Sequence, residues 1–154
     1  MAADTVLARL EAIEQIRALM YDYGYYVDVN DPDRLAELFT EDCSVTYGVD
    51  FGARGRVAYR GLLDGIGSYF ENTAHYVTNV TVEFTDTSHA SVRAMVFAWH
   101  RYVRDRPDSQ WLGYYFNEVV KADGAWRIRQ LEMRTVATVK HHLPLEDYLL
   151  LERG

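Results

Sequence analysis

The second half of the chain consists of four consecutive stretches in which apolar and polar residues alternate. The four stretches are residues 76–85, 89–103, 110–122 and 125–138. Alternation with a period of two is the pattern of a β-strand that buries one face. Short turn sequences separate them, namely Asp86-Thr87, Arg106-Pro107-Asp108 and Ala122-Asp123-Gly124. The pattern therefore predicts a meander of long antiparallel strands.

The first third of the chain has helical periodicity instead. A stripe of apolar residues at spacings of three and four predicts a helix over residues 5–29: Ile13, Ile16, Met20, Tyr23 and Val27. Gly24 interrupts this helix one turn before Asp28 and could leave space beside that carboxylate. Asp31-Pro32 supplies an N-cap and a first-turn proline for a short second helix that carries Leu35, Leu38 and Phe39.

The middle of the chain is less regular. Cys43 to Tyr47 alternates as a short strand. Residues 48–61 contain four glycines, which predicts a loop with a short strand at Val57–Tyr59. A third helix is expected over residues 62–71.

Helices followed by a meander predict an α+β fold. We expect a cone-shaped domain in which a curved, mixed or antiparallel sheet wraps around the N-terminal helices and encloses a pocket for a small ligand. With 154 residues, the chain is expected to form one domain over residues 1–154.

Composition excludes several classes of protein. The formal net charge is −7 and no basic cluster occurs, so we expect no nucleic-acid partner. A single cysteine, Cys43, allows no intramolecular disulfide and is typical of a reducing cytoplasm. No signal sequence or membrane span is visible, so a cytoplasmic protein is expected. The 12 Tyr, 6 Phe and 3 Trp favour a ligand pocket or an oligomer interface.

The two faces of stretch 89–103 differ in character. Small residues and a histidine occupy one face, which suits the wall of a cavity: Val92, Ala94, Val96, Ala98 and His100. The other face carries Met95, Phe97 and Trp99, which a monomer would expose. We interpret this second face as the interface of a homo-oligomer, a dimer or trimer.

Four residues are candidates for catalysis: Asp28, Tyr47, His75 and His100. A carboxylate beside a histidine fixes which ring nitrogen can accept a proton, and the pair acts as a general base. Each residue also has a structural explanation, as a helix-end acid, a core tyrosine or a hydrogen-bonded strand histidine. Simple alternation places His75 opposite the face of Val80, Val82 and Phe84, so a β-bulge or a bend where the strand begins would be needed to turn it inward.

No metal or cofactor motif is present in the sequence, and none is expected to be needed. His75 and His100 lack an obvious third ligand on a strand. The adjacent His141 and His142 point in opposite directions in an extended chain, so we expect them at the surface or in docking of the C-terminus.

The order of these motifs resembles the polyketide-cyclase-like (SnoaL-like) branch of the nuclear-transport-factor-2-like superfamily, which includes scytalone dehydratase and hexachlorocyclohexane dehydrochlorinase. The resemblance extends from about Ile13 to Arg134. It rests on Val27-Asp28 with Asp33-Arg34-Leu35, on His75-Tyr76-Val77-Thr78-Asn79, and on Tyr115-Phe116-Asn117-Glu118 leading to Asp123-Gly124-Ala125-Trp126.

The resemblance implies a catalytic dyad in which Asp28 orients His75, and helper roles for Tyr47 and His100 on substrate oxygens. It makes Arg129 a weaker candidate, and substrate contacts are expected from Tyr23, Val96, Tyr115, Asn117 and Arg129. The chain departs from the dehydratase pattern at Val27, Gly113 and Tyr115.

We therefore expect a cofactor-independent lyase or isomerase. Its reaction would be a dehydration by β-elimination, or a rearrangement or cyclisation, of a small hydrophobic cyclic or aromatic metabolite. Two alternatives stay open. One is a non-catalytic protein that binds a hydrophobic ligand, and the other is the small subunit of an aromatic-ring dioxygenase, which would co-purify with a larger chain.

Overall fold

The computed structural model describes residues 2–154, in which three helices precede four long strands. The helices are α1 (Ala2–Asp28), α2 (Pro32–Glu37) and α3 (Arg56–Gly67). The strands are β1 (Phe39–Thr46), β2 (Gly52–Arg54), β3 (Phe70–Phe84), β4 (His89–Tyr102), β5 (Ser109–Ala122) and β6 (Ala125–Val139). A short 3-10 helix, η1 (Leu145–Asp147), lies near the C-terminus.

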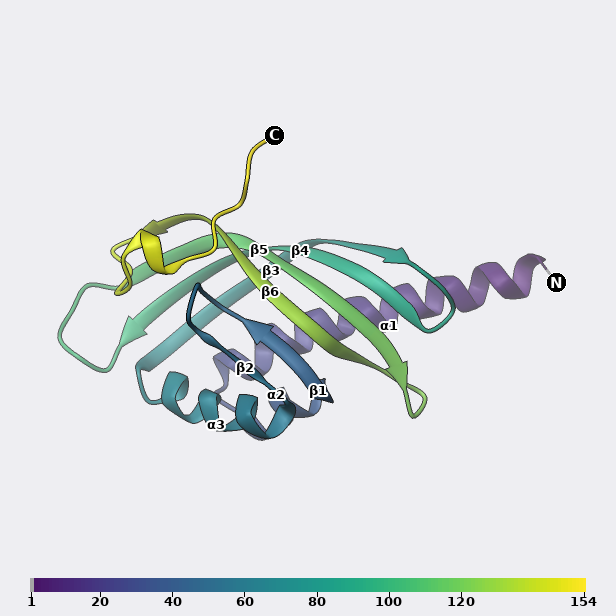
Figure 1. Cartoon of the computed structure of the whole chain (residues 1–154), viewed down its shortest axis with the longest axis horizontal. Coiled ribbons are helices and arrows are strands. Elements are labelled where there is room, and N and C mark those ends of the chain that lie inside the picture. The colour runs from purple at the N-terminus through teal and green to yellow at the C-terminus, as the bar shows by residue number, and fades with distance from the viewer. Residues whose placement is uncertain (1) are drawn as a thin grey trace.

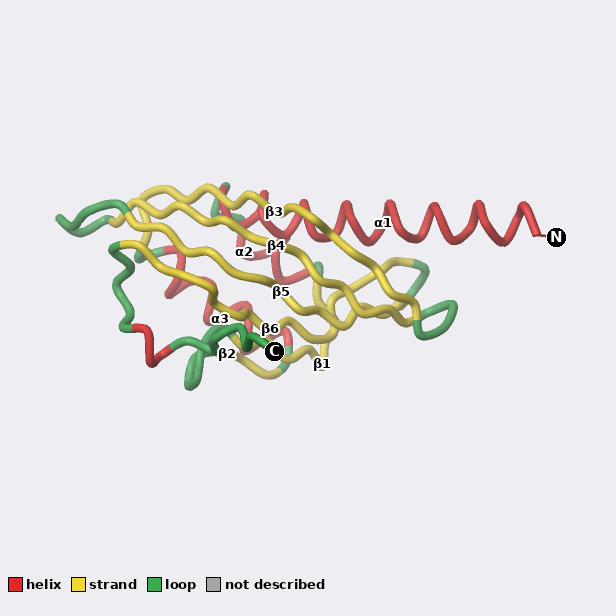
Figure 2. The backbone as a smooth tube through the Cα atoms, turned by 90° about the horizontal axis from the view of Figure 1, so that it is seen from above, coloured by secondary structure: helices red, strands yellow, loops and turns green. Residues whose placement is uncertain are grey.

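The six strands form one mixed sheet in the order β2-β1-β6-β5-β4-β3. Strand β1 runs parallel to β6, and the other neighbouring strands are antiparallel. The sheet is curved and unclosed, and the three helices lie along it (Figures 1 and 2). The N-terminal turns of α1 extend past the end of the sheet (Figure 2). The α+β fold expected from the sequence is therefore confirmed.

The inner face of the sheet forms the core. The small residues of β4 that were expected to form a cavity wall, Ala94, Val96 and Ala98, are buried. They join one apolar cluster with Ile16 and Met20 of α1. Small side chains on β4 leave room for the helices to pack into the curve of the sheet.

The segment between β1 and β3 differs from the prediction. Val57–Tyr59, expected as a strand, belongs to α3, and the helix expected over residues 62–71 begins at Arg56 and ends at Gly67. Glycines lower the intrinsic helix propensity of this segment. Burial of Tyr59 and Leu63, which are one turn apart on the same face, stabilises the helix instead. Phe39, assigned to the second helix, begins β1.

The outer face of the sheet is partly exposed. Met95, Phe97 and Trp99 lie on this face and are neither buried nor fully exposed. Phe97 pairs with Leu112 across the β4–β5 ladder, so the apolar surface continues onto β5. Within residues 2–154, no helix is long and apolar enough to span a membrane.

Candidate functional site

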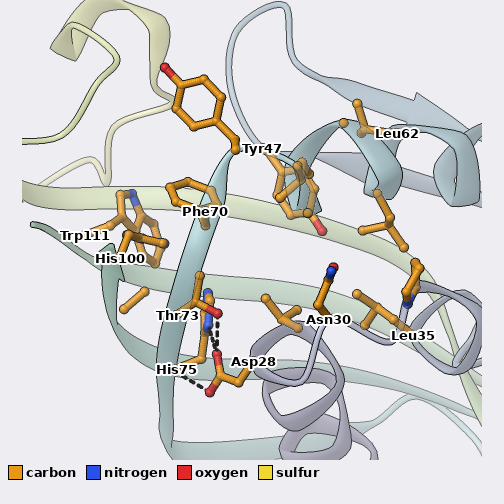
Figure 3. Close-up of a pocket in the computed structure, with 18 of the residues that line it drawn as sticks. Asp28, Asn30, Leu35, Tyr47, Leu62, Phe70, Thr73, His75, His100 and Trp111 are labelled. Carbon is orange, nitrogen blue, oxygen red and sulfur yellow. Dashed lines mark hydrogen bonds and ion pairs between the residues drawn. The ribbon is translucent and has the colours of Figure 1, made fainter. Parts of the chain in front are cut away.

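A cavity of about 360 Å³ lies between the inner face of the sheet and the helices. Most of its wall is aromatic or aliphatic, as in other sites that bind small hydrophobic molecules. Residues of α1, α2, α3 and the four long strands line it, and His141 to Leu143 and Tyr148 close one side. Figure 3 shows Asp28, Thr73, His75, His100 and Trp111 in this cavity.

Asp28 and His75 form a close pair at the cavity wall. The Nδ1 atom of His75 lies 2.7 Å from Oδ1 of Asp28, and the backbone N–H of His75 donates to Oδ2 at 2.8 Å. The hydroxyl of Thr73 donates to Oδ1 at 2.8 Å (Figure 3). Three hydrogen bonds from β3 therefore fix a carboxylate at the end of α1.

Close packing of α1 on β3 brings this pair together. Gly24 lies one turn before Asp28, and a Cβ atom there would be 3.2 Å from Cγ2 of Val77 and 3.6 Å from Cβ of His75. With any larger residue, Val77 or the helix would have to move by a few tenths of an ångström. The space that the sequence suggested at Gly24 is occupied by β3 itself.

A β-bulge turns His75 inward. The pairing of β3 with β4 shifts between Thr78 and Thr81, and Asn79 has a φ of 50°. Because a bulge inserts one extra residue into the strand, it reverses the alternation of faces. His75 and Val80 consequently both lie on the inner face of the sheet, whereas simple alternation would place them on opposite faces. Of the two possibilities that the sequence pattern left open, a bulge and a bend at the start of the strand, the structure has the bulge.

The electrostatics favour an ionised Asp28. Burial raises its pKa, but the hydrogen bonds from the ring and backbone of His75, the charge interaction with His75 and the Thr73 hydroxyl outweigh burial, so the pKa lies below its ordinary value. A carboxylate only accepts hydrogen bonds, so Nδ1 of His75 carries the proton. The Nε2 atom of the neutral ring is then able to accept one.

His100 lies beside His75, and the centroids of the two rings are 5.7 Å apart. It is 7% exposed and contacts the ring of Phe70. Burial, followed by the charges of His75, His141 and His142, lowers the pKa of His100 to about 3. His100 is therefore neutral at physiological pH. Among the described residues its Nδ1 atom has no hydrogen-bond partner.

Tyr47 lines the cavity, and its hydroxyl is held between two others. The Tyr47 oxygen lies 2.6 Å from that of Tyr23 and 2.7 Å from that of Tyr59. The sequence placed Tyr47 and Tyr23 in the site but missed Tyr59, which was assigned to a loop with a short strand. It also missed Thr73, although Thr73 shares a strand face with His75, two residues away.

The remaining predicted contact residues divide into two groups. Tyr115 lines the cavity together with Tyr23. Val96, Asn117 and Arg129 do not line it. Asn117 is buried with its Nδ2 3.5 Å from Sδ of Met20, and Arg129 is exposed where the β5–β6 register shifts. Their positions do not support contact with a ligand in this cavity.

His141 and His142 line the cavity, which the sequence did not predict, although contact of His141 with Tyr148 agrees with the expected role in docking of the C-terminus. Nδ1 of His141 bonds the hydroxyl of Tyr148, and Nδ1 of His142 lies 3.1 Å from the hydroxyl of Tyr102. The chain is not extended at this point, which removes the argument that adjacent residues point apart. Within the part of the chain that is described, no three His, Cys, Asp or Glu side chains are placed to hold a metal ion.

Comparison with protein families finds one match. The SnoaL-like domain family matches residues 8–132 of this chain. That range includes Asp28, Tyr47, His75 and His100 and ends before His141. A search of curated proteins finds no match.

Solved structures provide further relatives. A provisionally assigned scytalone dehydratase from Novosphingobium aromaticivorans is 40% identical over 97% of this chain and 99% of its own, with a TM-score of 0.92. A provisionally assigned aromatic ring hydroxylase from the same organism is 26% identical over 86% and 94% of the two chains, with a TM-score of 0.80. A type 2 hexachlorocyclohexane dehydrochlorinase is 23% identical over 90% and 97%, with a TM-score of 0.81, and shares the fold.

Proposed function

We propose that this chain, which belongs to the SnoaL-like domain family, is a cofactor-independent lyase or isomerase that removes a proton from a carbon atom of a small hydrophobic substrate. Its similarity to the provisional scytalone dehydratase supports a lyase-type enzyme in general. The observation that carries the specific proposal is the Asp28–His75 pair in the wall of an apolar cavity.

The proposed reaction is a β-elimination of water. Nε2 of His75 takes the proton from carbon, and the electrons of that C–H bond form the new double bond. The C–O bond to the leaving hydroxyl breaks with its electron pair, and the proton from His75 returns to the departing oxygen as water forms. Asp28 stabilises the transient imidazolium, which is the usual role of a carboxylate behind a catalytic histidine.

The charges of the cavity favour an uncharged substrate. Its acidic lining residues are Asp28, Asp31 and Glu71, and no lysine or arginine is among the described residues that line it. His100 adds no positive charge, because its pKa is about 3. A substrate carboxylate or phosphate would meet like charges without a cation to balance them. A neutral cyclic or aromatic alcohol or ketone suits this environment.

The experiment uses 5-nitrobenzisoxazole, a neutral aromatic compound that eliminates when a base removes its ring C–H. The N–O bond then breaks and releases a coloured phenolate, which is measured by absorbance. We expect turnover by the wild type and a loss of about 10²-fold or more in His75→Ala. His89→Ala is the matched control, because His89 pairs with Asp86 at 3.0 Å on the exposed β3–β4 turn. Equal rates for His75→Ala and the wild type would contradict the proposal.

A second candidate function is ligand binding without catalysis, which the apolar lining of the cavity favours. In that case Asp28→Asn would bind the aromatic probe as the wild type does, and neither protein would release phenolate. The role of small dioxygenase subunit predicts instead that the chain co-purifies with a larger metal-bearing chain.

A further inference from the structure

After β6 the chain folds back, as the yellow segment of Figure 1 shows, and His141 becomes part of the cavity wall. Lys140 makes this turn with a φ of 53°, in the left-handed region. Backbone hydrogen bonds through Asp147 and Leu149 then tie the segment to the loop after β1 and to β6. They fix Tyr148, which lies between them in the sequence and is 5% exposed.

Tyr148 determines which nitrogen of the His141 ring carries the proton. Its hydroxyl is hydrogen-bonded to Nδ1 of His141. A phenol is a stronger acid than a neutral imidazole, and an imidazole nitrogen is a stronger base than a phenol oxygen, so the favoured bond is O–H···N. Burial raises the pKa of Tyr148, which keeps its proton at neutral pH. Burial, followed by the charges of His142 and Arg106, lowers the pKa of His141 to about 4, so the ring is neutral and its single proton is on Nε2.

The Nε2 atom of His141 remains available to a ligand. No described residue hydrogen-bonds this atom, and burial does not close it off. The ring of His100 is adjacent, with its centroid 5.4 Å away, but no hydrogen bond joins the two rings. A ligand that fills the cavity without accepting the Nε2 proton would leave a buried donor unpaired, which is unfavourable. The position of His141 therefore favours a ligand with an acceptor atom on this side.

We propose that His141 is a specificity-determining residue: Tyr148 holds it in the form protonated on Nε2, and Nε2 donates a hydrogen bond to an acceptor oxygen of the substrate. His75 has the opposite form, because Asp28 accepts from its Nδ1–H and leaves Nε2 without a proton. The cavity thus presents one imidazole that accepts a proton and one that donates a hydrogen bond. The hydroxyl of Tyr148 and the carboxylate of Asp28 select these two forms.

Together with the proposed function, on which this step rests, the arrangement selects a neutral cyclic substrate with two features. One is the carbon-bound hydrogen that His75 removes, and the other is a carbonyl, hydroxyl or ether oxygen that reaches His141. The ring of His100 contacts both, with its centroid 5.7 Å from that of His75 and 5.4 Å from that of His141, so one bicyclic molecule can reach the two. An analogue that lacks the oxygen is disfavoured because the donor stays unpaired.

The first test determines the protonated nitrogen of each histidine ring by NMR of the ligand-free protein with isotope-labelled histidine. We expect the proton on Nε2 in His141 and on Nδ1 in His75. Tyr148→Phe should convert His141 to a mixture of the two neutral forms. Tyr102→Phe is the matched control, because it removes the corresponding hydroxyl from Nδ1 of His142 and should leave His141 unchanged. A proton on Nδ1 of His141 in the wild type would overturn the proposal.

The second test measures the carbonyl stretching frequency of bound fluorenone by infrared difference spectroscopy. Fluorenone is a neutral planar ketone with a single acceptor oxygen and no removable hydrogen, and a hydrogen bond to its carbonyl lowers the frequency. His141→Phe should raise the frequency toward its value in hexane. His141→Gln should keep it low, because the amide offers an N–H near the position of Nε2. His75→Ala should also keep it low, so the contact is tested even if the elimination proposal fails.

Three results would overturn the contact between His141 and the ligand. A wild-type frequency equal to that in hexane would mean that no donor reaches the carbonyl. A frequency in His141→Phe equal to that of the wild type would mean that another group holds the carbonyl. A return toward the hexane value in His142→Phe, with no change in His141→Phe, would assign the donor to His142.

Discussion

The carboxylate of Asp28 holds both the ring and the backbone of His75. One oxygen accepts from Nδ1 at 2.7 Å and the other accepts from the backbone N–H at 2.8 Å. The position of the strand and the orientation of the imidazole ring therefore depend on the same side chain. Because the pKa of Asp28 is below its ordinary value despite burial, the carboxylate stays ionised through the neutral pH range.

Replacing Asp28 by Asn should lower kcat/KM for 5-nitrobenzisoxazole about 10²–10⁴-fold. An amide offers one oxygen in place of two and carries no charge to stabilise the imidazolium. Thr73→Val is the milder comparison, because it removes one hydrogen bond and leaves the carboxylate intact. It should lower kcat/KM about fivefold. Thermal melting checks that both variants fold. A rate for Asp28→Asn equal to that of Thr73→Val would contradict the role of the charge.

Gly24→Ala should lower kcat/KM about tenfold by moving α1 away from β3. The new Cβ would lie 3.2 Å from Val77, which is tighter than normal packing. Displacement of α1 to relieve this contact would separate Asp28 from His75. Gly61→Ala is the matched control, because a Cβ at that helical position meets nothing within 4 Å. It should raise the free energy of unfolding by about 0.5–1 kcal/mol and leave the rate unchanged. Identical rates for the two variants would refute the packing explanation.

Acid should destabilise the fold through His100. Its pKa falls from 6.5 to about 3 on folding, chiefly because of burial. The unfolded state therefore binds more protons within this window, and the free energy of unfolding falls as the pH drops below 6.5. At pH 5 this effect of His100 lowers the free energy of unfolding by about 2 kcal/mol. Urea titrations at pH 7 and pH 5 should show a smaller difference for His100→Gln than for the wild type. An unchanged difference would mean that His100 does not control this response.

We propose that the outer face of the sheet associates with further copies of this chain. Light scattering should give the mass of a dimer or trimer for the wild type, and Phe97→Glu should give a monomer, because the charge would lie among Met95, Trp99 and Leu112. Val57→Glu on α3 is the control, since Val57 is 89% exposed and lies away from that face. A monomeric wild type would contradict this prediction.

The long strands could be predicted because alternation repeats over many residues in each of them. The first half of helix α3 could not, because glycines lower the helix propensity of this segment and burial of Tyr59 and Leu63 stabilises the helix instead. Local pattern and tertiary packing favour different structures in that segment.

The site likewise depends partly on local sequence pattern and partly on tertiary packing. The proximity of Asp28 and His75 depends on the packing of α1 against β3, which periodicity does not encode, and the family resemblance supplied it. The pattern indicated that a bulge or a bend must turn His75 inward, but it did not locate the bulge at Asn79. Asparagine tolerates a positive φ better than most residues, so its identity was the available signal.

The most direct test of the account follows proton removal from carbon by His75. The wild type is incubated with 2-tetralone in D2O, and NMR measures the exchange of the hydrogens next to the carbonyl for deuterium. This exchange requires a base but no leaving group. The account predicts exchange well above the buffer rate in the wild type, and exchange at the buffer rate in His75→Ala. Equal exchange by the two proteins, or none above buffer in either, would contradict it.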